Sequence, residues 1–438
     1  MATLRAILRA RRALVLTAAV LLWPAFPSVP QEAPAGLPEG VSPLPPGLGR
    51  RLQELLAETE TLRGLKAKRA VASGIVEERD LPARIAQALR EELPPERLQA
   101  AEAGLKAFGL IPESLDLAGY LPALLASEVA GYYDPERHYL AVVRRGGEAR
   151  RLDELVLVHE LAHALQDQTF DLQRFVTDDP LSDAAAARTA LVEGDASLVM
   201  FDWLAGQAAG PAPELPASKE MAAAPPWVRA TLELGYVDGY LFCLSVRQKG
   251  GQKLLDYTFS QDPPRSSEQI LHPEKWHTRR DDPVPLSWPG LGRELPGARK
   301  LAEGQLGELG IGVLLREATG DRELAEAAAA GWGGDRFAVY EKDGRRLLAW
   351  LTEWDTEADA RELREAARRL GKDWAVEPAE RRWPRRVVVL RGPWRPAEAR
   401  AVRAALAAVR AGRPDNRAPD LAGPASQSSS SEATPAGW

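Results

Sequence analysis

The chain has 438 residues, 45% hydrophobic and 27% charged, values typical of a soluble globular protein with more than one domain. Its net charge of −6, from 56 basic and 62 acidic residues, is mild for this length and argues against a nucleic-acid partner. The single cysteine, Cys243, excludes an internal disulfide, and it lies too far from the N-terminus for a lipoprotein anchor.

The first segment, residues 1–29, is typical of an export signal. Several arginines up to Arg12 precede an uncharged apolar run, residues 13–26, which Pro24 interrupts. The run is shorter than the roughly 18 residues expected of a spanning helix. A cleaved signal peptide and an uncleaved N-terminal anchor both stay open. Either predicts an exported protein, periplasmic or secreted, that contacts the membrane only through residues 13–26.

A linker rich in Pro and Gly is expected over residues 30–49, followed by a catalytic region over 50–330. A strand is expected over 70–76, and a β-hairpin over 131–143. The Pro-rich stretch 207–300 is expected to be irregular. Apolar periodicity predicts helices over 50–62, 81–92, 96–108, 115–130, 152–168, 183–206 and 301–318.

The pattern changes over residues 331–411, where the order strand, strand, helix, strand, helix predicts a small α+β module. We expect its helices on one face of one sheet. The tail, residues 412–438, contains a serine run, cannot bury a core and is expected to be disordered.

The most informative motif is His159-Glu160-Leu161-Ala162-His163, which matches HExxH inside a predicted helix. Positions i and i+4 lie on one helix face about 6 Å apart, so both imidazoles can reach one metal ion. Glu160 beside that ion can take a proton from a bound water. The alternative is a pair of histidines that bind nothing. An apolar stripe beside the pair argues against it, because buried imidazoles need partners.

A third ligand must come from elsewhere, since Gln166 and Thr169 stand where the longer pattern HExxHxxGxxH needs Gly and His. Glu193, on the next predicted helix, is the candidate. Gly194 costs about 1 kcal/mol relative to alanine inside a helix, which a close approach of two helix backbones would offset. Asp195 points to nearly the opposite face and is predicted to orient a histidine from outside the ligand set. For both carboxylates the alternative is a solvated helix face.

These features resemble the gluzincin branch of the zincin metallopeptidases, in which a glutamate on a later helix completes the HExxH site. The stretches GYYDP, HELAHALQDQ and LVEGDA, within about residues 120–205, are similar to a group of exported bacterial metallopeptidases. Residues 265–276 and 331–336 fit the same group. One departure is Ser197, which stands where thermolysin-like enzymes carry an aspartate. The gap before Glu193 is also longer than in those enzymes.

The resemblance implies an α+β, zincin-like catalytic domain built from an edge β-hairpin, the HExxH helix and a second ligand helix. It implies one Zn²⁺ per chain, held by His159, His163 and Glu193, with Glu160 as the general base.

Zincins bind an extended peptide along an edge strand beside the metal. The candidate strand here is His138, Tyr139, Leu140, Ala141, Val142 and Val143, with an ordinary sheet strand as the alternative. The oxyanion of the reaction also needs a donor. We expect His272 in that role, although a purely structural histidine is the alternative. Further candidates are His277, Tyr132 and Tyr133.

Together these features predict a zinc-dependent metallopeptidase that hydrolyses a peptide or protein substrate outside the cytoplasm. Two alternatives stay open: a zinc hydrolase acting on cell-wall peptides, and a non-catalytic metal-binding scaffold. The intact Glu160 argues against the scaffold, because a structural metal site needs no base.

Overall fold

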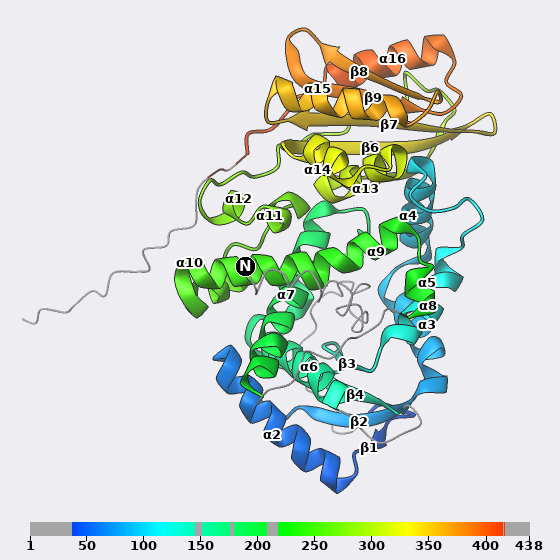
Figure 1. Cartoon of the computed structure of the whole chain (residues 1–438). Coiled ribbons are helices and arrows are strands. Elements are labelled where there is room, and N and C mark those ends of the chain that lie inside the picture. The colour runs from blue at the N-terminus through cyan, green and yellow to red at the C-terminus, as the bar shows by residue number, and fades with distance from the viewer. Residues whose placement is uncertain (1–36, 145–150, 176–178, 208–217, 415, 417–438) are drawn as a thin grey trace, which may run out of the picture.

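The computed structural model describes residues 37–144, 151–175, 179–207, 218–414 and 416 (Figure 1). These residues form an α+β fold with two β-sheets, in agreement with the fold class predicted from the sequence. The predicted export signal, residues 1–29, and most of the tail lie outside the described residues. Within the described ranges, no helix is long and apolar enough to cross a membrane.

The N-terminal sheet has the strand order β1-β2-β4-β3, with β2 and β4 parallel and the two edge strands antiparallel to their neighbours. Because β1 and the start of α2 fall within residues 30–49, the linker prediction is wrong for that part. The strands are β1 (Ser42–Pro43), β2 (Ala72–Glu77), β3 (Gly131–Asp134) and β4 (Tyr139–Arg144).

Six long helices lie in the same part of the chain as this sheet, and their residue ranges agree closely with the predicted ones. α7 begins where the side chain of Ser182 accepts a hydrogen bond from the backbone N–H of Ala185, and α2 ends at Gly64 in a left-handed conformation. The helices are α2 (Pro46–Arg63), α3 (Leu81–Glu92), α4 (Pro95–Phe108), α5 (Leu117–Glu128), α6 (Arg151–Phe170) and α7 (Asp183–Gly206).

Residues 219–277 are largely helical, so the prediction of irregular structure over 207–300 was wrong for that part. Some of its prolines lie at helix starts, where the missing N–H costs nothing, as Pro226 does at the start of α9. Gly250 and Gly251 kink α10 and hide its periodicity. The elements are α8 (Lys219–Ala222), α9 (Pro226–Glu233), the π-helical turn η4 (Leu234–Asp238), α10 (Gly239–Ser260), α11 (Ser267–Leu271) and α12 (Glu274–His277).

The C-terminal sheet has five antiparallel strands in the order β5-β6-β7-β9-β8. It begins before residue 331, because β5 pairs with β6 where the sequence predicted only helix. β8 was also not predicted. The strands are β5 (Arg299–Gly304), β6 (Trp332–Lys342), β7 (Arg345–Trp354), β8 (Trp374–Glu380) and β9 (Trp383–Arg391).

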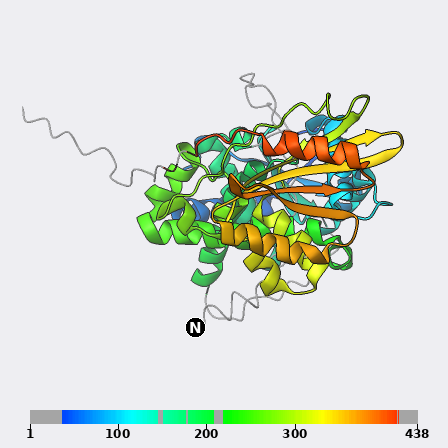
Figure 2. The same ribbon diagram turned by 90° about the horizontal axis from the view of Figure 1, so that it is seen from above.

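Helices cover both faces of this sheet, so the prediction of helices on one face was wrong. Alternate residues of β9 face opposite cores: Val387 and Val389 join one, and Val388 and Leu390 the other. Figure 2 shows α15 and α16 on opposite sides of the strands. The helices of this part are α13 (Gly307–Thr319), α14 (Arg322–Ala329), α15 (Glu357–Ala366) and α16 (Pro396–Ala407).

The first residues of the predicted tail are ordered. The backbone N–H of Gly412 bonds to the carbonyl oxygen of Pro285, and the Asn416 side chain accepts from the backbone of Asp282. The rest of 412–438 falls outside the described residues.

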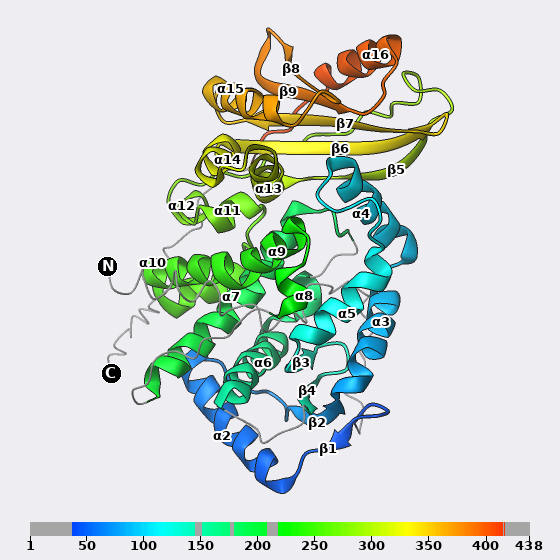
Figure 3. The same ribbon diagram turned by 45° about the vertical axis from the view of Figure 1, so that its right-hand side comes forward.

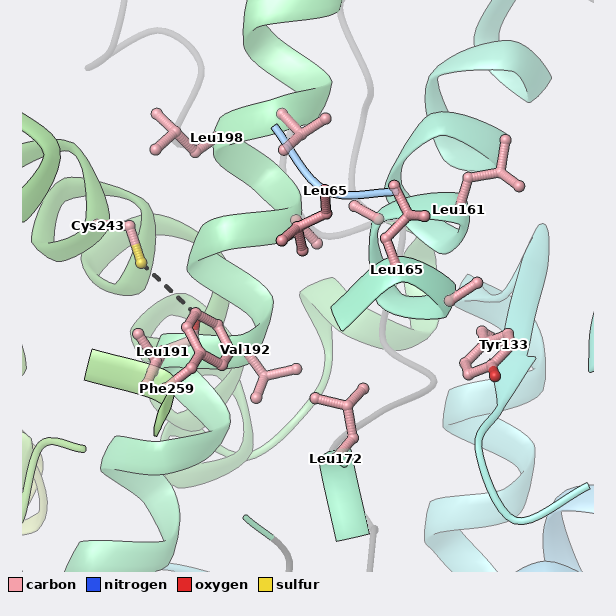
Figure 4. Close-up of a cluster of buried hydrophobic side chains, with 14 of the residues drawn as sticks. Leu65, Tyr133, Leu161, Leu165, Leu172, Leu191, Val192, Leu198, Cys243 and Phe259 are labelled. Atoms are coloured by element: carbon pink, nitrogen blue, oxygen red, sulfur yellow. Dashed lines mark hydrogen bonds between the residues drawn. The ribbon is translucent and has the colours of Figure 1, made fainter. Parts of the chain in front are cut away.

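The largest core of the N-terminal part packs α2, α6, α7 and α10 against one another. Leu161 and Leu165 of α6 point toward this core, as do Leu191 and Val192 of α7 (Figure 4). Cys243 of α10 is fully buried there, with its thiol directed at the carbonyl oxygen of Leu191. This packing holds α6 and α7 rigidly side by side.

Candidate metal centre

The two histidines of the HExxH motif meet on one face of α6, and both are buried. The Nε2 atoms of His159 and His163 lie 3.0 Å apart, with the two rings nearly perpendicular. This is the geometry expected for positions i and i+4, with both nitrogens aimed at the same point.

Helix α7 brings Glu193 to that point. Its Oε2 atom lies 3.1 Å from Nε2 of His159 and 3.6 Å from Nε2 of His163. Three ligands about 2.0–2.1 Å from a tetrahedral zinc would be separated by roughly 3.3 Å, which these distances bracket. The three residues predicted as metal ligands are therefore brought together with spacings that fit one zinc ion.

Unpaired atoms around this point fit a metal as well. Buried Nδ1 of His159, Oε1 of Glu193 and Oε1 of Glu160 have no hydrogen-bond partner among the described residues. Buried polar atoms rarely stay unpaired, because each costs the free energy of its lost hydration. A cation bound beside the two carboxylates would offset that cost for their oxygens.

The charges of the metal-free centre are strongly coupled. Burial would raise the pKa of Glu193, but the neighbouring His163 lowers it to about 2. Burial would likewise lower the pKa of His163, but the Glu193 carboxylate raises it to about 9. Burial lowers the pKa of His159. The metal-free site therefore holds an ionised glutamate against a protonated His163.

Glu160, the predicted base, lies beside the predicted ligands, and a hydrogen bond from the N-terminal sheet holds its side chain in place. Its Oε2 atom accepts a 2.8 Å hydrogen bond from the backbone N–H of Tyr133 on β3. Burial, with the charge of Glu193 adding to it, raises the pKa of Glu160 to about 8. A carboxylate with this pKa is suited to take up and return a proton near neutral pH.

A buried chain of hydrogen bonds fixes the orientation of His163. The side-chain NH₂ of Gln166 donates to the Val192 carbonyl and to the Asp195 carboxylate, both of which can only accept. The amide oxygen of Gln166 must therefore face Nδ1 of His163, 2.8 Å away, and accept its proton. This tautomer leaves Nε2 free for a metal.

Asp195 acts on His163 through Gln166, and no hydrogen bond joins it directly to a histidine in the described part of the chain. Its charge is matched by Arg63 of α2, whose Nε lies 2.7 Å from Oδ2. Arg63 is buried and also pairs with Asp256 on α10. The sequence indicated an outer role for Asp195 but gave no signal for Gln166 or Arg63.

The structure corrects the predicted substrate strand. The residues predicted for that role, His138 to Val143, form β4 and the turn before it. β4 lies between β2 and β3, so both its edges are already paired. His138 has a left-handed backbone conformation and bonds to Asp167 of α6. The edge strand beside α6 is β3, and the N–H of Tyr133 points away from β4 toward Glu160.

The candidates for an oxyanion donor are dispersed. Nε2 of His272 pairs with Glu308 of α13 at 2.8 Å, and His277 bonds to Ser245. Neither contacts the ligands or Glu160 through any bond in the described residues. The Tyr132 hydroxyl bonds to that of Tyr139. The Tyr133 hydroxyl donates to Asp167.

Tyr236 is the aromatic residue at the centre that the sequence did not reveal. It lies in the π-helical turn η4, and its ring centroid is 5.8 Å from that of His159. π-helical turns often occur at functional sites. The only signal in the sequence was the pair of glycines flanking it, Gly235 and Gly239.

The two further stretches of the resemblance have structural roles. In residues 265–276, Ser267 donates its backbone N–H to Asp183 at the start of α7. In residues 331–336, Asp335 accepts hydrogen bonds from the backbone of Leu306 and Gly307 and from two buried tryptophans, Trp332 and Trp350. The first stretch also joins the N-terminal part to the C-terminal module, because Lys275 pairs with Asp355 after β7. The contacts of Asp335 stay within that module.

One family model matches the chain, over residues 294–416, and its description is Domain of unknown function (DUF8575). The match coincides with the C-terminal sheet and its helices, and places the start of that module before residue 331. No curated protein and no solved structure matches the chain.

Proposed function

We propose that this protein is a zinc-dependent metallopeptidase of zincin type, acting on peptide bonds outside the cytoplasm. The observation that carries the proposal is the meeting of His159, His163 and Glu193 at one buried point, with Glu160 beside them. A purely structural metal site would have no need of this fourth acid, whose Oε1 has no hydrogen-bond partner among the described residues.

Zinc bound there supplies polarisation of the substrate carbonyl and acidification of a water molecule. The protein residues do the rest. Glu160 takes the proton from the attacking water and returns it to the leaving amine, as its raised pKa allows. β3 offers an open strand edge to an extended peptide, which would pass directly by Glu160.

The decisive experiment compares Glu160→Gln with the wild-type protein on casein and on purified peptidoglycan. The amide keeps the shape of the side chain and loses the base, so hydrolysis should fall by at least about 100-fold while zinc content stays unchanged. Glu154→Gln is the matched control, because Glu154 lies on the same helix and pairs with Arg51 at the surface.

Comparing the two substrates distinguishes a protein substrate from a cell-wall substrate. Cleavage of casein supports a protein substrate, and cleavage of peptidoglycan alone supports a cell-wall substrate. A zinc-loaded wild-type protein that cleaves neither, or a Glu160→Gln variant with full activity, contradicts the proposal.

A further inference from the structure

An apolar cavity of about 200 Å³ lies between the N-terminal helices and the C-terminal module. We call it the apolar cavity. Residues of α4, α5, α7 and α9 line it. Figure 3 shows these helices beneath the C-terminal sheet. Its walls include Phe108, Leu124, Ala186, Thr189, Trp227 and Phe337.

Two of the helices that line the cavity continue along the chain to the candidate metal centre, although neither the predicted ligands nor Glu160 line the cavity itself. On α7, Ala186 and Thr189 line the cavity, and Glu193 follows Thr189 by one turn on the same face. On the other side, Leu232 of α9 lines the cavity four residues before Tyr236, whose ring lies against His159. Gly235 lies between Leu232 and Tyr236 and packs against the Glu193 side chain, because a Cβ atom on Gly235 would lie 3.6 Å from Cγ of Glu193.

The cavity is larger than ordinary packing defects. Protein interiors hold few voids larger than a water molecule, because empty apolar space forfeits packing contacts. An engineered cavity of roughly 150 Å³ lined by similar residues stays dry and binds benzene. Ala185, Ala186, Thr189 and Trp227 are only half-buried, so the described residues leave this side of the cavity open.

The C-terminal module completes this cavity. Leu306 and Leu309, at the start of α13, and Phe337 of β6 belong to the matched family region and form its far wall. Phe337 packs edge-on against Phe108 of α4, which fixes that wall to the N-terminal part.

We propose that the apolar cavity receives a large apolar side chain of the peptide substrate, and that the C-terminal module thereby determines specificity. The inference rests on the proposed peptidase function. It assigns the module of unknown function a part in substrate selection. An aromatic or long aliphatic side chain near the scissile bond has the size and polarity that the cavity accepts.

The test uses peptides that differ only by Phe or Ala at one position, scanned on both sides of the cleaved bond. The wild-type protein should favour Phe at one position by about 10-fold or more in kcat/KM. Ala186→Phe fills the cavity and should abolish that preference while the Ala peptide is still cleaved. Ala184→Phe is the matched control on the same helix, outside the cavity lining, and should keep the preference.

A variant of the module tests its contribution separately. Leu309→Ala removes part of the far wall and should lower kcat/KM for the Phe peptide more than for the Ala peptide. Leu324→Ala, on an exposed position of α14, should change neither. Binding of fluorobenzene, followed by fluorine NMR, gives a readout without turnover. It should saturate in the wild-type protein and in Ala184→Phe, and be lost in Ala186→Phe.

The outcomes separate the two proposals. Peptide cleavage without an apolar preference, or with a preference that survives Ala186→Phe, overturns the inference and leaves the peptidase standing. No cleavage of any peptide overturns both. Failure of fluorobenzene to bind the wild-type protein shows that the cavity is not accessible and also overturns the inference.

Discussion

Three side-chain atoms define the candidate metal centre, and one residue outside this set, Gln166, orients the second of its histidines, His163. Nδ1 of His163 donates its proton to the amide oxygen of Gln166, and this tautomer leaves Nε2 free to bind a metal. Gln166 can accept this hydrogen bond only because Val192 and Asp195 occupy its two N–H groups. The orientation of a predicted ligand on α6 thus depends on the position of α7, through the buried amide of Gln166.

Glu193→Ala should therefore lower zinc affinity further than either Gln166→Met or Asp195→Ala. Outer partners typically contribute about 10–100-fold, and loss of a direct ligand should exceed that range. Competition with a chelator measures all three variants. Asp195→Ala removes one of the two carboxylates that pair with the buried Arg63 and leaves only Asp256, so the fold of this variant must be checked by circular dichroism. Zinc affinity that falls more in Gln166→Met than in Glu193→Ala contradicts the ligand assignment.

The affinity of the protein for zinc should increase as the pH rises. The pKa of His163 is raised to about 9, so zinc must displace a proton at lower pH. Apparent affinity should rise about 10-fold per pH unit toward that value and level off above it. Calorimetry in buffers of different ionisation enthalpy should show proton release. An affinity that is constant from about pH 6 to 8 contradicts a protonated His163.

At the scale of elements, the contact between α7 and α10 sets the position of Glu193. A Cβ atom on Gly194 would lie 2.1 Å from the backbone carbon of Gly239, and one on Gly239 would lie 2.1 Å from the Ala190 carbonyl oxygen. The close approach expected from Gly194 is thus confirmed, but its partner is the start of α10. This contact presses η4, with Tyr236, against the metal centre.

Gly194→Ala should therefore lower the free energy of unfolding by roughly 1–3 kcal/mol, because the helix backbones must separate. Gly206→Ala is the matched control at the end of the same helix, where an added Cβ meets nothing within 4 Å. It should be neutral, or stabilising by roughly 0.4–1 kcal/mol. Urea denaturation of both variants provides the comparison. Equal stability of Gly194→Ala and wild type would show that the two helices can move apart freely.

At the scale of the whole molecule, one core crosses from the N-terminal part into the C-terminal module. Phe108 of α4 stacks edge-on against Phe337 at 4.9 Å and Trp350 at 5.2 Å, both on the C-terminal sheet. Lys275 adds a polar link, because it pairs with Glu268 of α11 and with Asp355 after β7. The module is packed on the N-terminal part as one continuous structure.

The protein should accordingly unfold in a single transition. Phe108→Ala should lower the free energy of unfolding by roughly 3–5 kcal/mol, since a large side chain is removed from a shared core. Calorimetry and tryptophan fluorescence should give coincident transitions for both proteins. Two separate transitions in the wild type would indicate that the module folds independently.

The sequence alone predicted the α+β class, most helices, the hairpin and the three residues that meet at the metal centre. These features depend on local pattern: apolar periodicity specifies helices, and the i, i+4 spacing aligns two histidines on one helix face. Helix geometry also indicated that Glu193 and Asp195 could not both be ligands, because residues two positions apart point to nearly opposite sides, and the resemblance indicated Glu193.

What only the tertiary structure decided depends on contacts between distant residues. Which strand of the hairpin is the open edge was decided by β2, which pairs with β4 from far away in the sequence. Gln166, Arg63 and Tyr236 gain their positions from the packing of α2, α7 and η4 around α6. The spacing of residues along the chain does not predict these contacts, because they form only when the helices and sheets pack together.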